Sequence, residues 1–321
     1  MAGSGDQVKA LVRSHAAGDE EAFYSVALQV AAHAARQGHH RLADDLKTEI
    51  EASRKRPRKV VSIAQPRGDL SDLVTASHPD VGLKDMVLAD AVSAQIHQVL
   101  REQRMRKQLL DHGFAPAHRL LLEGPPGTGK TMTASVLAHE LSLPLLTIRL
   151  DGVMSKYLGE SASKLRLIFD EIEQQRGVYL FDEFDALGAD RMGNDVGEAR
   201  RILNSFLVFL DDCSYESIVV AATNHKTILD KALFRRFDIV IDYSLPDEQQ
   251  AIQIIRNRLG TLAKGVKWSY LANEFAGLSH SDLERAAELA AKNVILSGGQ
   301  TVSVADIRGA LQLRRLATNA A

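Results

Sequence analysis

Apolar positions beyond residue 68 fall into short runs that alternate with stretches of helical periodicity. Five of these runs have the character of buried strands: 119–122, 145–150, 178–181, 218–222 and 239–243. Strands separated by helices favour a parallel sheet that is covered on both faces. The pattern therefore predicts an α/β domain over 68–245, built on a five-stranded parallel sheet.

The two ends of the chain carry helical patterns without strands. After the fifth strand the apolar positions recur every three or four residues, which predicts a helical lid over 246–321. Residues 19–37 form the clearest amphipathic stretch near the start, and we expect a small N-terminal helical domain over 1–53. Residues 54–67 have a composition typical of an exposed linker: five basic side chains fall within 54–59, and the segment contains two prolines.

Composition narrows the class of protein. The 321 residues suffice for about two domains, and 45% hydrophobic residues exclude a wholly disordered chain. A net charge of −2 lacks the basic excess of a dedicated nucleic-acid-binding protein. The single cysteine, Cys213, cannot form an internal disulfide. Residues 1–10 have no apolar signal core, and no apolar run approaches the ~18 residues that span a bilayer. We expect a cytoplasmic protein with no membrane partner.

The clearest motif follows the first predicted strand of the sheet. Residues 124–131 read Gly-Pro-Pro-Gly-Thr-Gly-Lys-Thr and fit the pattern G-x-x-x-x-G-K-[ST] between a strand and a helix. In such a loop the backbone N–H groups surround phosphates, the lysine reaches the β- and γ-phosphate oxygens, and the threonine binds Mg²⁺. The motif predicts a P-loop nucleotide site for ATP and Mg²⁺. Its candidate ATP-binding residues are Gly124, Pro125, Pro126, Gly127, Thr128, Gly129, Lys130, Thr131 and Met132.

Polar side chains at the ends of later strands complete a candidate hydrolytic site. The strand 178–181 runs into Asp182 and Glu183. We expect Asp182 to join the ATP site and hold Mg²⁺ through water beside Thr131, and Glu183 to polarise the attacking water. Asn224 follows the strand 218–222 and is placed to orient the same water, although an asparagine there is by itself typical of a turn. Arg235 and Arg236 precede the last strand, where a pair of surface salt bridges is the alternative interpretation.

Together these residues resemble the AAA ATPases over about 68–313. The resemblance assigns the Walker A motif to 124–131, the Walker B motif to 178–183, the first sensor to Asn224, and the arginine fingers to Arg235 and Arg236. It implies a ring, usually a hexamer, in which these arginines reach the ATP of the neighbouring subunit. Adjacent finger arginines are most similar to the katanin and spastin branch, and a bacterial-type single-ring member also fits.

The same resemblance extends to three further segments. Residues 155–161 are similar to the pore loop of AAA protein unfoldases. This similarity implies that the substrate is contacted by Lys156, Tyr157, Leu158 and Gly159. Residues 191–201 occupy the place of a second pore loop and of interface arginines. Residues 277–282 resemble a lid turn beside the nucleotide, with His280 where the family has glycine, and 85–88 fall where members pack against adenine.

Two functional hypotheses follow. The first is an ATP-driven ring that remodels a protein client through its pore, with the N-terminal helices selecting the client or partner. A partner protease on another chain fits this hypothesis, because no H-E-x-x-H sequence occurs here. The alternative, less favoured, is an ATP-switched DNA-binding factor whose basic residues 54–59 contact phosphates.

Overall fold

The computed structural model describes residues 20–36, 38, 41, 43–48, 68–154, 160–187, 196–224 and 231–319. The chain divides into two units, 1–62 and 63–321. In the first, helix α2 (Glu20–Arg36) closely matches the amphipathic stretch expected over 19–37. Among the described residues of this unit, the buried apolar positions are Ala31 and Ala34 of α2 and Ala43, which begins a short helical segment over 43–48. The basic residues 54–59 lie outside the described residues.

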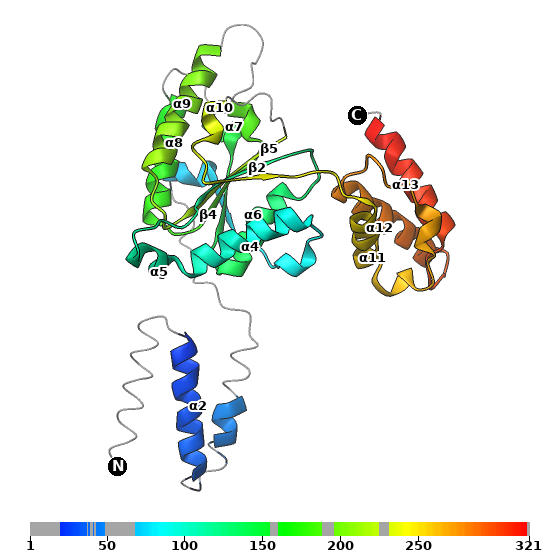
Figure 1. Ribbon diagram of the computed structural model, residues 1–321, viewed down its shortest axis with the longest axis horizontal. Helices are drawn as coiled ribbons and strands as arrows, with labels where there is room; N and C mark the ends of the chain where they lie inside the picture. Colours follow the sequence, from blue (N-terminus) through cyan, green and yellow to red (C-terminus); the bar gives the residue numbers. More distant parts are fainter. Residues whose placement is uncertain are drawn as a thin grey trace. The chain divides into compact units, whose positions relative to one another are not determined.

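The second unit is built on a sheet of six strands in the order β1-β3-β4-β5-β2-β6 (Figure 1). The five predicted strands are confirmed, and all their neighbouring pairs are parallel. Their bounds are β2 (Arg119–Glu123), β3 (Leu145–Ile148), β4 (Val178–Phe181), β5 (Ile218–Thr223) and β6 (Ile239–Asp242).

The sheet has one strand more than predicted. Strand β1 (Val74–Ser77) pairs with β3 in antiparallel register, with Val74 opposite Ile148 and Ser77 opposite Leu145. Only two of its four residues are apolar, and it lies at the edge of the sheet, so it lacks the continuous apolar run of a central strand. The sheet is therefore mixed, with a parallel centre and one antiparallel edge.

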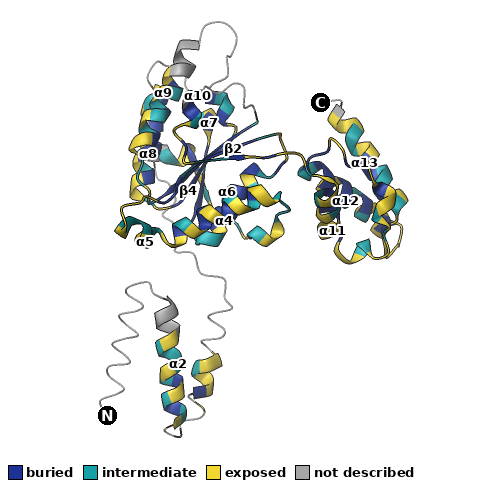
Figure 2. Ribbon diagram, viewed as in Figure 1, coloured by how far each residue is buried: buried dark blue, intermediate teal, exposed yellow. Residues whose placement is uncertain are grey.

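Helices cover both faces of the sheet, as Figure 2 shows by burial. Leu120 and Leu122 of β2 face one side, where they pack with α4 (Asp90–Arg104) and α6 (Lys130–Leu141). Leu121 faces the other, with α7 (Leu150–Val153), α8 (Glu160–Gln174) and α9 (Val196–Asp212). Every residue of β5 is buried, as expected for a central parallel strand. Short helices complete this part: η1 (Gly68–Asp72), η2 (Leu83–Asp85), α5 (Arg106–Asp111), η3 (Phe184–Leu187) and α10 (Lys231–Phe234).

The residues after β6 form the expected helical lid. Its core lies among α11 (Glu248–Leu259), α12 (His280–Leu296) and α13 (Val304–Asn319), with η5 (Gly260–Ala263) and η6 (Trp268–Leu271) between them. Reciprocal capping bonds begin each of these three helices: Asp247 with Gln250 at α11, Ser279 with Asp282 at α12, and Ser303 with Asp306 at α13. No helix among the described residues has both the length and the apolar character needed to cross a membrane.

Candidate nucleotide site

The loop between β2 and α6 adopts a conformation that requires its glycines. Gly124, Gly127 and Gly129 have positive φ angles of 141°, 74° and 101°, a region that glycine occupies without steric cost. A Cβ atom on Gly124 would overlap the carbonyl oxygen of Tyr243. The loop therefore passes directly against the end of β6 and delivers Lys130 and Thr131 to the first turn of α6.

Lys130 lies inside this loop. Its Nζ atom donates to the carbonyl oxygens of Gly124 and Pro125, both at 2.8 Å. Burial lowers the pKa of the ammonium group, and the carboxylates of Asp182 and Asp185 oppose that shift. The lysine side chain thus lies within a loop of backbone groups, the arrangement that binds phosphate oxygens.

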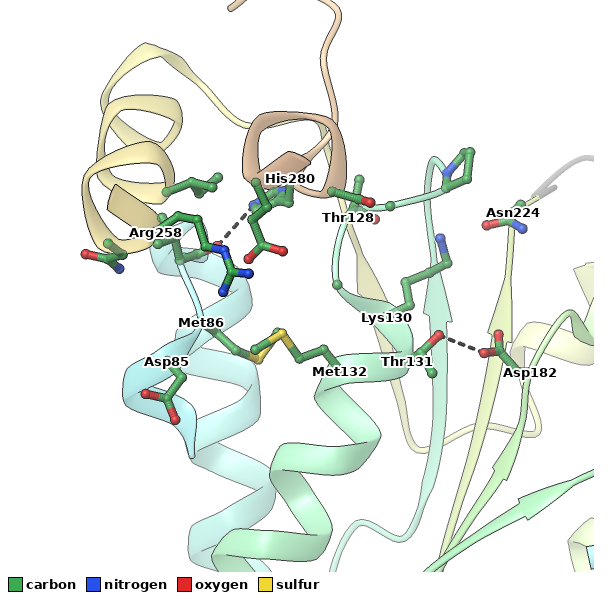
Figure 3. A pocket seen from close by; sticks show the side chains of 18 of the residues that line it. Asp85, Met86, Thr128, Lys130, Thr131, Met132, Asp182, Asn224, Arg258 and His280 are labelled. Atoms are coloured by element: carbon green, nitrogen blue, oxygen red, sulfur yellow. Dashed lines mark hydrogen bonds between the residues drawn. The ribbon is translucent and has the colours of Figure 1, made fainter. Parts of the chain in front are cut away.

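Thr131 and Asp182 meet at the edge of the sheet (Figure 3). The Thr131 hydroxyl donates to Asp182 Oδ2 at 2.7 Å, and Asp182 Oδ1 accepts from the backbone N–H of Glu183 at 2.9 Å. Hydroxyl and carboxylate oxygens are the ligand types that Mg²⁺ prefers. This pair therefore fits the expected metal ion by the chemistry of its donors.

Glu183 is exposed beside the cavity, while the turn that carries it is firmly held. Its backbone adopts a left-handed conformation, with φ of 50°, which is uncommon for a residue other than glycine. Its carbonyl accepts from Ala186 N–H at 2.8 Å. The next residue, Phe184, is fully buried, and its ring lies 4.7 Å from that of Phe206 on α9.

Asn224 follows β5 and lies on the same side of the sheet as Glu183. Asp185, in η3, connects the two strand ends: its Oδ1 atom accepts from Thr223 Oγ1 at 2.9 Å and from the backbone N–H of Asn224 at 3.3 Å. Asp185 was not among the residues predicted from the sequence. Its position two residues after Glu183 was the available signal, but the contact with residues 38 and 39 positions further on required the fold.

These groups border one cavity of about 820 Å³. The structure brings Asp182, Glu183 and Asn224 together with the loop residues 126–132 around this space. Gly124 and Pro125 belong to the loop but do not line the cavity. Its other side is formed by Lys84, Asp85, Met86, Val87, Ile254, Asn257, Arg258, His280, Ser281 and Glu284. Among the described residues, the cavity thus combines a cationic loop, carboxylates and an apolar wall.

Two hydrogen bonds connect the lid to residues on the other side of the cavity. The ring N–H at Nε2 of His280 donates to Val87 O at 3.0 Å, and Ser281 N–H donates to Gly127 O at 3.1 Å. Burial lowers the pKa of His280, which favours its neutral form. The two segments that the resemblance placed beside the nucleotide, 85–88 and 277–282, therefore both contribute to this cavity.

Arg235 and Arg236 are exposed and are not among the residues that line the cavity of their own chain. Arg236 forms an ion pair with Asp211 on α9. Asp238 fixes the segment that follows: it accepts from the backbone N–H groups of His118 and Arg119, both at 2.9 Å, and from Arg119 Nη2 at 2.6 Å. Burial alone would raise the pKa of Asp238, but these hydrogen bonds outweigh it and lower the pKa well below its ordinary value.

The expected pore-loop residues Lys156, Tyr157, Leu158 and Gly159 lie outside the described residues, as do 191–195 of the second expected loop. Residues 196–201 of that segment belong to α9. The structure therefore describes the nucleotide site and leaves the substrate loops as predictions from the sequence.

Comparisons with known proteins show which family the chain is related to. The family described as "ATPase family associated with various cellular activities (AAA)" matches residues 120–245. The "Uncharacterized AAA family ATPase y4kL" of Sinorhizobium fredii is 31% identical over 315 residues, which make up 96% of this chain and 94% of that protein.

Further matches include larger proteins and a solved structure. ATP-dependent zinc metalloproteases FtsH from Thermoanaerobacter sp. and Sphaerobacter thermophilus are 31% and 34% identical over 79% and 75% of this chain. The chain spans only 43% and 51% of their respective lengths. The crystal structure of the FIGL-1 AAA domain aligns with a TM-score of 0.61 at 24% identity, over 76% of this chain and 86% of that one, which supports the fold.

Proposed function

The chain belongs to the AAA family of ATPases, and we propose that it hydrolyses ATP to remodel a protein client within a homo-oligomeric ring. One observation carries the ATPase part: the P-loop lysine, the Thr131–Asp182 pair, Glu183 and Asn224 all border a single cavity. A bare phosphate-binding loop would not need the second carboxylate or the amide. Their combination supports hydrolysis in addition to binding.

Binding of ATP is assigned to the loop and the lid. The backbone N–H groups of the loop and the Lys130 ammonium group hold the phosphates, so Lys130 exchanges its present carbonyl partners for phosphate oxygens. Met86, Val87 and Ile254 supply apolar surface for the base. Thr131 and Asp182 hold Mg²⁺, which when bound neutralises charge on the phosphate oxygens.

Hydrolysis is assigned to the two polar groups on the sheet edge. Glu183, with its carboxylate exposed to the cavity, accepts a proton from water that attacks the terminal phosphate. Asn224 orients that water with its amide. Arg235 and Arg236 lie outside the cavity of their own chain, which supports a role at the site of a neighbouring subunit, where such an arginine stabilises the charge of the transition state.

Remodelling of a protein client is supported by the relatives and by the sequence. Two of the relatives are named as ATP-dependent proteases, whose substrates are proteins. The expected loop residue Tyr157 combines an aromatic ring with a neighbouring glycine, a combination suited to gripping a chain regardless of its sequence. We assign client or partner selection to the helices of residues 1–53.

Glu183→Gln tests the ATPase assignment. The amide cannot accept the proton, so we expect nucleotide affinity to be retained while kcat falls by a factor of about 10² to 10⁴. Binding of a fluorescent ATP analogue and phosphate release measure the two quantities separately. Glu248→Gln, an exposed change at the start of α11, is the matched control. Substantial turnover by the Glu183 variant would refute its role as the base.

The same variant tests the choice of client. Glu183→Gln, loaded with ATP, is used to capture binding partners from a lysate of the native host, beside the double variant Glu183→Gln/Tyr157→Ala. Proteins that bind the first and are lost from the second support a remodeller that grips its client with Tyr157. Nuclease-sensitive nucleic acid retained by both, without such proteins, contradicts it.

A further inference from the structure

Asp185 lies next to the candidate hydrolytic residues without lining the cavity they border. It belongs to η3, the short helix that begins directly after Glu183, and its side chain is half-buried. A single carboxylate oxygen, Oδ1, accepts both from the Thr223 hydroxyl at 2.9 Å and from the backbone N–H of Asn224 at 3.3 Å. Asp185 therefore joins the segment after β4 to the end of β5.

This connection begins where the backbone pairing of the two strands stops. The register between β4 and β5 ends with Phe181 opposite Ala221. Glu183 and Asn224 both lie beyond that last pair, so the pairing of β4 with β5 does not by itself fix their separation. The two bonds to Asp185 connect the strand ends past this point.

The segment that carries Asp185 has little freedom to move relative to Glu183. The backbone N–H of Glu183 donates to Asp182 Oδ1, and the carbonyl of Glu183 accepts from the N–H of Ala186. Phe184, the residue after Glu183, is fully buried. A displacement of Asn224 would thus have to break its bond to Asp185 or disturb this turn. These contacts consequently fix the position of the Asn224 backbone relative to that of Glu183.

We propose that Asp185 is a positioning residue for ATP hydrolysis, which fixes Asn224 relative to Glu183 without touching the nucleotide. This inference rests on the proposed function, in which both residues act on one water molecule. Misplacement of a reacting group by about 1 Å can cost on the order of 10²-fold in rate. A role of this kind affects kcat and leaves binding intact.

Asp185→Ala and Asp185→Asn separate this role from a general structural one. The alanine variant loses both bonds, and we expect kcat to fall on the order of 10²-fold with the dissociation constant for a fluorescent ATP analogue unchanged. The asparagine variant keeps a carbonyl oxygen as acceptor, and we expect it to recover about tenfold of that loss. Asp170→Ala, which removes an exposed carboxylate on α8, is the matched control. Equal impairment of the two Asp185 variants would overturn the proposal.

A double-mutant cycle tests whether Asp185 acts through Asn224. We expect Asp185→Ala to cost little further in the background of Asn224→Ala, because the group that it positions is gone. If the fold-losses in kcat of the two single variants multiply in the double variant, the proposal is overturned. Thr223→Val removes one of the two bonds and serves if Asp185→Ala does not fold; it should lower kcat at unchanged nucleotide affinity, and full activity counts against the proposal.

The outcomes also separate this proposal from the proposed function. A wild-type chain without ATPase activity, or a fully active Asn224→Ala variant, contradicts the proposed function and with it the role of Asp185. An active wild type, an impaired Asn224→Ala variant and multiplying losses contradict the role of Asp185 alone.

Discussion

Two neighbouring arginines differ in their surroundings. The guanidinium of Arg236 is paired with Asp211, whose carboxylate also lies 3.9 Å from Nη1 of Arg119. Arg235 is exposed at the end of α10. An arginine that acts on a neighbouring subunit must be able to leave its own chain's contacts. This requirement makes Arg235 the better candidate for the trans-acting finger and Arg236 the one that is held within its subunit.

Substitution of each arginine separates the two roles. We expect Arg235→Ala to reduce kcat by a factor of about 10³ or more, in the range for loss of an arginine finger, with no change in the free energy of unfolding. Arg236→Ala breaks an exposed ion pair, so it should lower that free energy by about 1 kcal/mol at most. Asp211→Ala is the control: it removes the same ion pair together with the contact to Arg119, so its effect on stability should be at least that of Arg236→Ala. Thermal unfolding and phosphate release provide the measurements. If Arg236→Ala is the more damaging to kcat, the assignment is reversed.

Candidate residues that lie at a fixed spacing along the chain could be located from the sequence alone. The spacing of residues 124–131 and the carboxylates after β4 were recognisable because each motif must be contiguous to surround a phosphate or follow a strand. Asp185 and Asp211 could not be assigned in this way. Their partners, Asn224 and Arg236, are respectively 39 and 25 positions further along the chain, and only the strand order brings them together.

At the scale of secondary structure, β5 could be recognised from its local sequence, whereas β1 depends on a distant partner strand. A strand that is buried on both faces is apolar along most of its length, so the run 218–222 of β5 could be recognised in the sequence. The edge strand Val74–Ser77 alternates between buried and more exposed positions over four residues, which is too short for a clear period. Its pairing is decided by the neighbouring edge of β3, information that a local pattern does not contain.

The start of β6 provides a prediction about stability and pH. Asp238 is the residue directly before β6, and it connects this strand to the start of β2 by accepting hydrogen bonds from His118 and Arg119. Asp238→Asn removes the charge, and we expect the free energy of unfolding at neutral pH to fall by about 2 kcal/mol. Because the pKa of Asp238 is lowered by folding, its contribution is present above the unfolded pKa of about 3.9 and is lost as pH falls below it.

The difference between wild type and this variant should therefore shrink below about pH 4. Urea unfolding at a series of pH values measures it. Asp80→Asn, in which the original side chain is fully exposed, is the control and should show almost no difference at any pH. A constant difference between wild type and Asp238→Asn down to pH 2 would show that the carboxylate charge is not the stabilising feature.

At the scale of the whole molecule, the nucleotide cavity is the place where the lid meets the sheet. A Cβ atom on Gly127 would lie 2.6 Å from the Ser279 hydroxyl, and Ser281 donates to the carbonyl of Gly127. The phosphate-binding loop and the first turn of α12 thus move together or break this contact. The phosphate-binding loop is thus in direct contact with the first turn of α12, a connection that the proposed remodelling activity would require.

The assembly itself can be tested by mixing two inactive variants. Lys130→Ala disables its own nucleotide site but retains Arg235, whereas Arg235→Ala retains the site and lacks the finger. If the finger acts between subunits, an Arg235→Ala site beside a Lys130→Ala subunit is complete. With random mixing at equal amounts, about a quarter of the interfaces have this order whatever the ring size, so we expect up to about a quarter of wild-type ATPase activity. Co-purification through a tag on one variant verifies that subunits exchange, and the separate variants are the controls. Mixed assemblies that stay inactive would mean that Arg235 completes no site across an interface, whereas activity that appears only on mixing requires that it does.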